Sequence, residues 1–80
     1  MNKLARAVYE AKKNKSKIQA SIRLKKNGRF SSVAGIIKDL KVSRDGFAYA
    51  TINKGYKEYQ NVRLDNILAI RTNGRIYKKQ

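Results

Sequence analysis

Residues 17–25 alternate between polar and apolar side chains, and this period of two constrains the fold more than any other feature of the chain. The apolar positions are Ile18, Ala20, Ile22 and Leu24. Alternation of this kind predicts a strand with one buried face and one exposed face. Asn27-Gly28 follows directly, and Asn-Gly is the strongest short signal for a β-hairpin because both central residues of a type I′ turn need positive φ. The chain is therefore expected to begin its sheet with a hairpin.

A two-residue loop at Asn27-Gly28 also predicts the register of this hairpin. It pairs Lys26 with Arg29 and sets small or apolar residues of the second strand opposite the apolar face of the first. These pairs are Leu24 with Ser31, Ile22 with Val33, Ala20 with Gly35 and Ile18 with Ile37. The same register puts Phe30 on the exposed face beside Lys25, where an aromatic ring flanked by cations can stack a base and bind its phosphates. The alternative is that Phe30 covers the core or lies under a helix.

Residues 2–14 are expected to form a short amphipathic helix. Asn2 can cap its start, and the apolar side chains recur at helical spacing. They are Leu4, Ala7, Val8 and Ala11. The opposite face is basic, and a basic amphipathic helix can lie on a membrane surface. Because the apolar face is mostly alanine and offers little area to lipid, the sequence favours a helix that packs on the domain.

The rest of the chain is expected to supply four more strands. The second strand is long and bends at Gly35, since a glycine inside a strand commonly marks a barrel corner. Its apolar residues change phase there, from Val33 and Ile37 to Ile36, Leu40 and Val42. Asp65-Asn66 predicts one tight helical turn, because both side chains can bond nearby backbone amides. The other elements are turns at 43–46 and 54–55, strands at 47–53, 56–64 and 67–71, and a tail that starts at a second Asn-Gly pair, 73–74.

Together these elements predict a mainly β fold, with an N-terminal α-helix followed by a five-stranded, strongly bent barrel. Closure into a barrel removes the exposed edges of a sheet. An 80-residue chain has room for one thin core, so residues 1–80 are expected to form a single domain. Within it the helix covers 2–14, the barrel 17–71 and a basic tail 72–80.

The order of these parts resembles the Sm-like family, whose members are small SH3-like barrels. The residues that carry the resemblance are 24–29 (Leu-Lys-Lys-Asn-Gly-Arg), Gly35 and 62–67 (Val-Arg-Leu-Asp-Asn-Ile). The likeness covers residues 2–71. The chain is also similar to the bacterial YolD-like proteins, which share this kind of barrel and a comparable closing segment. Both resemblances imply the barrel fold.

The functional residues of the Sm-like family match this chain in part. In Sm proteins the arginine of the closing motif and an asparagine of the first motif hold a uridine at a ring pore. Arg63 stands where the closing motif has its arginine, while Leu64 replaces the glycine that follows it. No asparagine stands near Arg44-Asp45, where the first motif has its own. The resemblance therefore implies general affinity for nucleic acid, and not the uridine pocket.

The charge of the chain points to a polyanionic partner. Twenty Lys and Arg residues against five Asp and Glu give a net charge of +15, far beyond what solubility requires, and nucleic acid is the most common partner of such a surface. The alternative is a solvated basic surface without a partner. No stretch approaches the ~18 consecutive apolar residues of a membrane span. A cytoplasmic or nucleoid-associated protein is expected.

The composition argues against an enzyme, a metal site or a cofactor. The chain has no cysteine and no histidine, which removes disulfides, thiolate zinc sites and the commonest general base. The acidic residues are scattered, with no pair that spacing supports as a catalytic dyad. We read each of them as a turn residue or a local counter-charge: Asp39, Asp45, Glu58 and Asp65.

The sequence thus predicts a non-enzymatic module that binds RNA or DNA, mainly through the backbone, with a regulatory role open to it. The alternative is a protein-binding adaptor or inhibitor, of viral or mobile-element origin, that docks on an acidic partner; self-assembly into a homo-oligomer is left open. The exposed aromatic residues among Phe30, Tyr49, Tyr56, Tyr59 and Tyr77 are candidates for stacking bases. The predicted nucleic-acid-binding residues are Lys12, Lys13, Lys15, Lys17, Arg23, Lys25, Lys26, Arg29, Phe30, Arg63, Arg75, Lys78 and Lys79.

Overall fold

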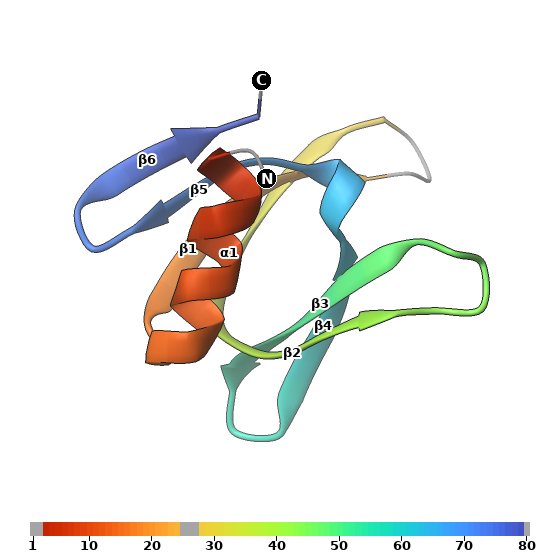
Figure 1. The fold of residues 1–80 in the computed structure, drawn as a ribbon, viewed down its shortest axis with the longest axis horizontal. Coiled ribbons are helices and arrows are strands. Elements are labelled where there is room, and N and C mark those ends of the chain that lie inside the picture. Colours follow the sequence, from red (N-terminus) through yellow and green to blue (C-terminus); the bar gives the residue numbers. More distant parts are fainter. Residues whose placement is uncertain (1–2, 25–27, 80) are drawn as a thin grey trace.

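In the computed structural model, which describes residues 3–24 and 28–79, one helix precedes a sheet of six strands (Figure 1). Helix α1 spans Lys3–Asn14. The strands are β1 (Lys17–Arg23), β2 (Phe30–Val42), β3 (Ala48–Gly55), β4 (Glu58–Arg63), β5 (Ile67–Thr72) and β6 (Arg75–Lys78), and the 3-10 helix η1 (Leu64–Asn66) joins β4 to β5. The mainly β class and the N-terminal helix are confirmed. The predicted cap, Asn2, lies outside the described residues.

The sheet is antiparallel and does not close on itself. Its strand order is β4-β3-β2-β1-β5-β6, so β4 and β6 are its two edges. The prediction of a five-stranded barrel is wrong in both respects, because the sheet has six strands and two edges. The physical reason is β6, which pairs along the outer edge of β5. That is the edge β4 would need in order to close a five-stranded barrel.

The sixth strand arises from the second Asn-Gly pair. Asn73 and Gly74 have φ of 52° and 76°, the positive values that a type I′ turn requires at both central positions. Thr72 pairs directly with Arg75 across this turn. Residues 75–78, which the sequence assigns to the basic tail at 72–80, therefore form a hairpin with β5.

The first hairpin forms in a register that differs from the predicted one by two residues. Ile22 lies opposite Ser31, and Ala20 lies opposite Val33, whereas the two-residue loop predicts Val33 as the partner of Ile22. Because a shift of two residues keeps each side chain on its own face, the strict alternation of buried and exposed residues along β1 is as predicted.

A longer loop accounts for the shifted register. The backbone N–H of Leu24 donates to the carbonyl of Arg29 at 2.7 Å, and the N–H of Gly28 donates to the carbonyl of Leu24 at 2.9 Å. Leu24 and Arg29 therefore close the loop. The predicted pair of Lys26 with Arg29 and the predicted turn at Asn27-Gly28 involve residues outside the described part of the chain.

Strand β2 bends as predicted, but the alternation of buried and exposed side chains changes phase after Gly35 and not at it. The buried positions continue through the glycine, at Val33, Gly35 and Ile37, and the register with β3 breaks between Ile37 and Asp39. Lys38 is thus the extra residue of a β-bulge, and bulges bend a strand. Of the apolar residues expected beyond the phase change, Leu40 is half-buried, while Ile36 and Val42 are exposed.

Gly35 has a different role, which is to let β3 approach β2. A Cβ atom at this position would lie 2.1 Å from the carbonyl oxygen of Asn53 and 2.8 Å from its carbonyl carbon. Only glycine fits where two backbones come this close. The sequence correctly predicts a special backbone position here, and the neighbouring strand is its cause.

The remaining turns agree with the sequence in two places out of three. Residues 43–46 form the β2–β3 turn, in which the N–H of Gly46 donates to the carbonyl of Ser43 at 3.0 Å, and Asp65-Asn66 lie in the short helix η1. The β3–β4 turn, expected at 54–55, falls at 56–57, and Lys57 there has φ of 56°. The third and fourth strands keep their predicted order.

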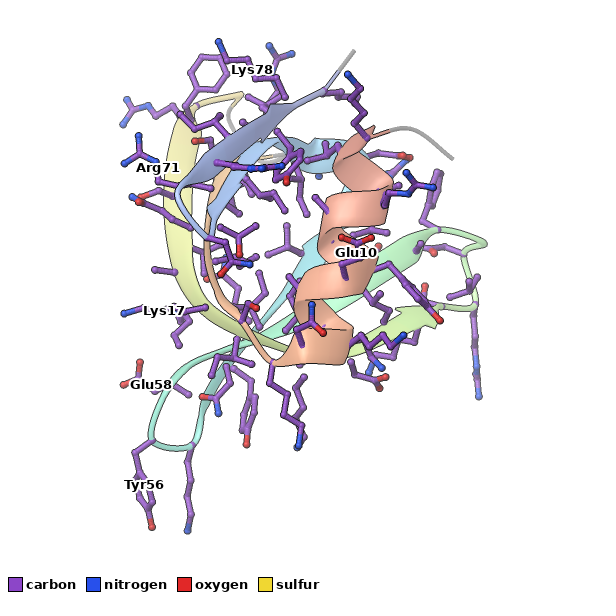
Figure 2. The ribbon with its side chains drawn as sticks, turned by 60° about the vertical axis from the view of Figure 1, so that its left-hand side comes forward. Glu10, Lys17, Tyr56, Glu58, Arg71 and Lys78 are labelled. Atoms are coloured by element: carbon purple, nitrogen blue, oxygen red, sulfur yellow. The ribbon has the colours of Figure 1, made fainter. Side chains whose placement is uncertain are left out.

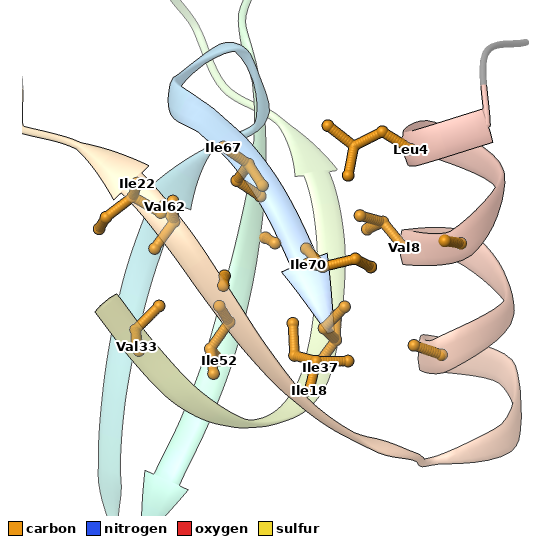
Figure 3. Packing of buried hydrophobic residues seen from close by; sticks show 14 residues of the cluster. Leu4, Val8, Ile18, Ile22, Val33, Ile37, Ile52, Val62, Ile67 and Ile70 are labelled. Atoms are coloured by element: carbon orange, nitrogen blue, oxygen red, sulfur yellow. The ribbon is translucent and has the colours of Figure 1, made fainter. Parts of the chain in front are cut away.

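Helix α1 packs the predicted face onto the sheet, against β2, β5 and β6. Its end is closed by two hydrogen bonds typical of a helix C-cap, from Lys15 N–H to the Lys12 carbonyl and from Ser16 N–H to the Ala11 carbonyl. The core that the helix and the sheet enclose is aliphatic (Figure 3). Its members are Leu4, Ala7, Val8, Ala11, Ile18, Ala20, Ile22, Val33, Ile37, Ala50, Ile52, Val62, Ile67 and Ile70.

Candidate nucleic-acid interface

The acidic residues of the chain are absent from three of the six strands. None of the five lies on β1, β5 or β6. They are Glu10 on α1, Asp39 on β2, Asp45 in the β2–β3 turn, Glu58 on β4 and Asp65 in η1. The half of the sheet built from β1, β5 and β6 therefore carries cations without counter-charges of its own.

Strand pairing assembles one continuous surface on this half of the sheet, because directly opposed residues share a face. Ser21 lies opposite Ser32 of β2 and Ala69 of β5, and Ala69 lies opposite Lys78 of β6. The rows on either side follow the same rule. We call this surface the outer sheet face; it comprises Lys17, Gln19, Ser21, Arg23, Phe30, Ser32, Ala34, Ile36, Ala69, Arg71, Ile76 and Lys78.

The outer sheet face has short side chains at its centre and long cations around them. Ser21, Ser32 and Ala34 are all exposed, so an extended backbone can lie close to the sheet there. A depression of about 190 Å³ is lined by Gln19, Ser21, Ala69, Ile70, Arg71 and Ile76. Figure 2 shows Lys78, Arg71 and Lys17 along one side of the ribbon, with Glu58 beyond Lys17 on the β3–β4 hairpin. A cationic rim around a flat floor suits a polyanion.

Phe30 lies on the outer sheet face, as the sequence predicts. Its side chain is 67% exposed, so it does not cover the core or lie under the helix. Arg23 pairs with it directly, and the guanidinium carbon lies 5.3 Å from the centre of the ring. The predicted register sets Ser32 opposite Arg23, and the two-residue shift explains the difference. An exposed ring next to an arginine provides a surface on which a base can stack.

The structure divides the other predicted binding residues among several places. Lys17, Arg23, Phe30 and Lys78 belong to the outer sheet face. Lys12 and Lys15 line a separate groove at the end of α1. Three further predicted residues are exposed elsewhere: Lys13 on α1, Arg29 after the first loop and Arg75 at the start of β6. Lys25 and Lys26 lie outside the described residues.

Two of the predicted residues are already engaged within the protein. The guanidinium carbon of Arg63 stacks 3.2 Å from the centre of the Phe47 ring, its Nη2 pairs with Asp65 at 3.3 Å, and its side chain is only 20% exposed. Lys79 donates from Nζ to the backbone carbonyl of Asp65 at 2.7 Å. Both side chains hold η1 in place. Each side chain would have to give up these contacts in order to bind a phosphate.

Two cations that sequence reasoning missed occupy central positions. Arg71 lies in the middle of the outer sheet face because β6 extends the sheet beyond β5. Lys38 projects from the bulge of β2, and its Nζ lies 4.6 Å from the centre of the Tyr59 ring. The alternation of Ala69 and Arg71 along β5 could have identified the first. No signal in the sequence gives the position of the bulge.

The candidate stacking residues differ in their exposure. Tyr56 is 87% exposed and Tyr59 is 48% exposed. Tyr49 and Tyr77 are half-buried, and Tyr77 packs against the core. Phe30, Tyr56 and Tyr59 are therefore the rings of this set that an unpaired base can reach.

Asp45 organises the β2–β3 turn through several hydrogen bonds. Its carboxylate accepts bonds from the Ser43 hydroxyl, from the Phe47 N–H at 2.9 Å and from the Tyr49 hydroxyl at 2.9 Å. The bond from Ser43 and then that from Phe47 lower the pKa of Asp45 below its ordinary value of 3.8, with smaller contributions from Tyr49 and from the charge of Arg63. The bond to Asp45 raises the pKa of Tyr49 above 10.0.

These shifts predict a pH dependence that Asp45→Asn should remove. Because the pKa of Asp45 is lower in the folded protein than in the unfolded chain, the carboxylate contributes stability above about pH 4 and loses it as the pH falls through the folded-state pKa. We expect Asp45→Asn to lower the free energy of unfolding at pH 7, and to lower it by a smaller amount at pH 2. Urea unfolding at both pH values, with Asp39→Asn as control, measures this. A deficit of equal size at both pH values would contradict it.

The described residues contain neither a cluster of three or more acidic side chains that could hold a metal ion nor a helix long and apolar enough to cross a membrane.

The chain was also compared with known proteins. No family model matches it, and no curated protein and no solved structure shows significant similarity to it.

Proposed function

We propose that this protein is a non-enzymatic module that binds nucleic acid through the outer sheet face, mainly by contacts to phosphates. One observation carries the proposal: every charged side chain on this face is a cation, namely Lys17, Arg23, Arg71 and Lys78. Eight of its twelve residues lie on β1, β5 and β6, the strands that carry no acidic residue. A surface of this kind attracts polyanions and releases their counterions on binding.

The arrangement of the cations supports contacts to a backbone. Arg71 and Lys78 are diagonal neighbours on β5 and β6, since Arg71 pairs with Ile76 and Lys78 with Ala69. Such neighbours are roughly 7–8 Å apart, so their side chains can reach two successive phosphates. The short side chains of Ser21 and Ser32 beside them leave room for the backbone and can donate further hydrogen bonds. Phe30 with Arg23 would hold an unpaired base at the edge of the face.

The resemblance to Sm-like and YolD-like proteins remains part of this proposal. The order of a helix followed by strands, the glycine in β2 and the short helix before β5 support it. The additional strand β6 and the contacts of Arg63 with Phe47 and Asp65 differ from what the resemblance implied. Affinity for nucleic acid is therefore proposed from the outer sheet face and not from the closing motif.

A charge-reversal experiment tests the proposal. Purified, nuclease-treated protein is titrated by fluorescence anisotropy against single-stranded RNA, single-stranded DNA and duplex DNA at several salt concentrations. We expect the double variant Arg71→Glu, Lys78→Glu to bind duplex DNA roughly 50-fold more weakly at 0.1 M salt, because two lost phosphate contacts reduce the slope of log K against log salt by about 1.8. On single strands the slope should fall by about 1.4.

The matched control reverses two charges elsewhere. Lys41 and Arg44 are exposed on the β2–β3 hairpin, on the opposite side of the molecule from the β5–β6 hairpin in Figure 1. The double variant Lys41→Glu, Arg44→Glu has the same net charge as the test variant and should retain the salt slope. Equal losses in both variants would reject the outer sheet face as the site. Binding that vanishes at physiological salt for all three polymers would reject the function and favour an acidic protein as the partner.

A further inference from the structure

A second basic surface adjoins the outer sheet face at Ile36, in a groove between the end of α1 and the β2–β3–β4 part of the sheet. The groove encloses about 380 Å³, which is within the range of small-molecule sites. It is lined by Lys12, Lys15, Ile36, Ile37, Lys38, Asn53 and Tyr59. Three lysines, one aromatic ring and an exposed aliphatic side chain thus meet in one concavity, with no acidic residue among them.

The apolar part of the groove follows directly from strand pairing. Ile36 lies opposite Asn53, and Asn53 lies opposite Tyr59, so these three side chains form one row across β2, β3 and β4. Ile36 is 41% exposed and Tyr59 is 48% exposed. The Oδ1 atom of Asn53 accepts the N–H of Gly55 at 3.1 Å, which leaves its NH₂ group as the donor on that side chain. A flat apolar row with one amide donor is the composition of a base-binding surface.

Two of the three lysines of the groove occupy unusual backbone positions. Lys15 is the residue after the helix and has φ of 55°, in the left-handed region where glycine is preferred at a helix end. Lys38 is the extra residue of the β2 bulge, and bulges commonly redirect a side chain toward a functional site. Residues that break a local rule are found most often at functional sites. Lys15 thus carries its charge where the backbone conformation is disfavoured for a side chain, and Lys38 carries its charge where the strand is irregular.

We propose that the groove binds one nucleotide of a single-stranded nucleic acid, with the base stacked on Tyr59 against Ile36 and the adjacent phosphate held by Lys12, Lys15 and Lys38. In the free protein the ammonium of Lys38 covers the Tyr59 ring at 4.6 Å. An exposed cation–π contact is weaker than the stacking of a base on an aromatic ring. The base therefore displaces the ammonium, which turns to the phosphate. This inference rests on the proposed function and adds to it a preference for unpaired strands, since a paired base cannot enter the groove.

The experiment uses a fluorescein-labelled single-stranded 12-mer of mixed sequence and the duplex of the same sequence as probes. We expect Tyr59→Ala to lower affinity for the single strand by about tenfold without changing the salt slope, because stacking releases no counterions. Tyr59→Phe, which keeps the ring, should restore the affinity. Tyr9→Ala, on the 58% exposed tyrosine of α1, is the matched control and should have no effect. Affinity for the duplex should be unchanged in all three variants.

Lys15→Gly tests the phosphate half of the groove without endangering the fold. Glycine suits the left-handed backbone of this position, so a loss of affinity cannot be attributed to unfolding. We expect the salt slope on the single strand to decrease by about 0.7. The groove is rejected if Tyr59→Ala and Lys15→Gly both bind the single strand like the wild type while Arg71→Glu, Lys78→Glu binds it weakly; the proposed function then stands. If the wild type binds neither probe, the function itself fails.

Discussion

Gly35→Ala is expected to lower the free energy of unfolding by about 3 kcal/mol, a large part of the roughly 4–12 kcal/mol that an 80-residue domain has in total. The new Cβ would lie 2.1 Å from the carbonyl oxygen of Asn53 and 3.0 Å from Cγ2 of Ile52. The oxygen belongs to the backbone of β3, which is held by its pairing with β2 and β4. The clash therefore cannot be relieved by a side-chain rotation, and the central strands must separate.

The protein offers a matched control for this substitution in Gly55. A Cβ at Gly55 would meet no atom within 4 Å, and the backbone there does not have positive φ. Gly55→Ala is expected to change stability by less than about 1 kcal/mol. Urea unfolding followed by circular dichroism compares the two variants. If Gly35→Ala is as stable as Gly55→Ala, the close approach of β3 to β2 is not present in solution.

Ile52→Ala is expected to cost about 3–4 kcal/mol, because it truncates a side chain at the centre of the core to a single methyl group. Ile52 is 0% exposed and lies between Ile37 on β2 and Gln60 on β4. The neighbouring strands are fixed by their hydrogen bonds, so the cavity cannot close by collapse. Ile52→Val should cost only about 1 kcal/mol.

An exposed isoleucine serves as the reference for this series. Ile76 on β6 is 53% exposed, and Ile76→Ala should change the free energy of unfolding by about 0.5 kcal/mol or less. In thermal and urea unfolding the largest loss of stability is expected for Ile52→Ala, a smaller one for Ile52→Val and the smallest for Ile76→Ala. A small effect of Ile52→Ala would mean that the core is loosely packed, and the assignment of the buried face of β3 would have to be abandoned.

The sequence identifies Asn-Gly as a hairpin turn, but that turn type is predicted at only one of the two places where it could form. Asn-Gly occurs twice, at 27–28 and at 73–74, and the pattern around each pair predicts a hairpin at the first and the start of a tail at the second. The second pair forms a two-residue hairpin turn with positive φ at both positions. The short segment after it, Arg-Ile-Tyr-Lys, is too brief and too polar to stand out as a strand by periodicity. Tertiary contacts decide that this segment pairs with β5. That pairing in turn keeps the sheet open.

Alternation predicts the faces of β1 correctly even though the predicted register is wrong. A shift of two residues leaves every side chain on the same face, so the buried row from Ile18 to Ile22 and the exposed Phe30 are unaffected. The bulge at Lys38 is different, because one extra residue reverses the faces of everything that follows. The exposed Val42 and the half-buried Leu40 therefore could not be assigned from the pattern alone.

The sequence predicts which kinds of side chain form the candidate site better than it predicts where in the fold they lie. The abundance of cations is visible in the sequence, but Lys78 belongs to the outer sheet face only because β6 pairs with β5 and places it beside Ala69. Likewise, the groove depends on pairing that places Tyr59 in one row with Ile36, 23 positions earlier in the sequence. Non-local pairing of this kind has no signature in a single sequence. Arg63 shows the converse, since its stacking on Phe47 could not be foreseen from the motif in which it lies.

The two edges of the sheet make self-association of the protein depend on whether its charge is neutralised by a ligand. Within the described part of the chain, strands β4 and β6 each have one side without a partner strand, and such edges can pair with another copy of a chain. The +15 net charge keeps copies apart in the absence of ligand. Under the proposed function, a polyanion would neutralise this charge while it concentrates many copies along one strand, so repulsion would be weakest where the local concentration is highest. The protein is thus most soluble when free, and its tendency to condense should peak where the charges of protein and polymer are equal.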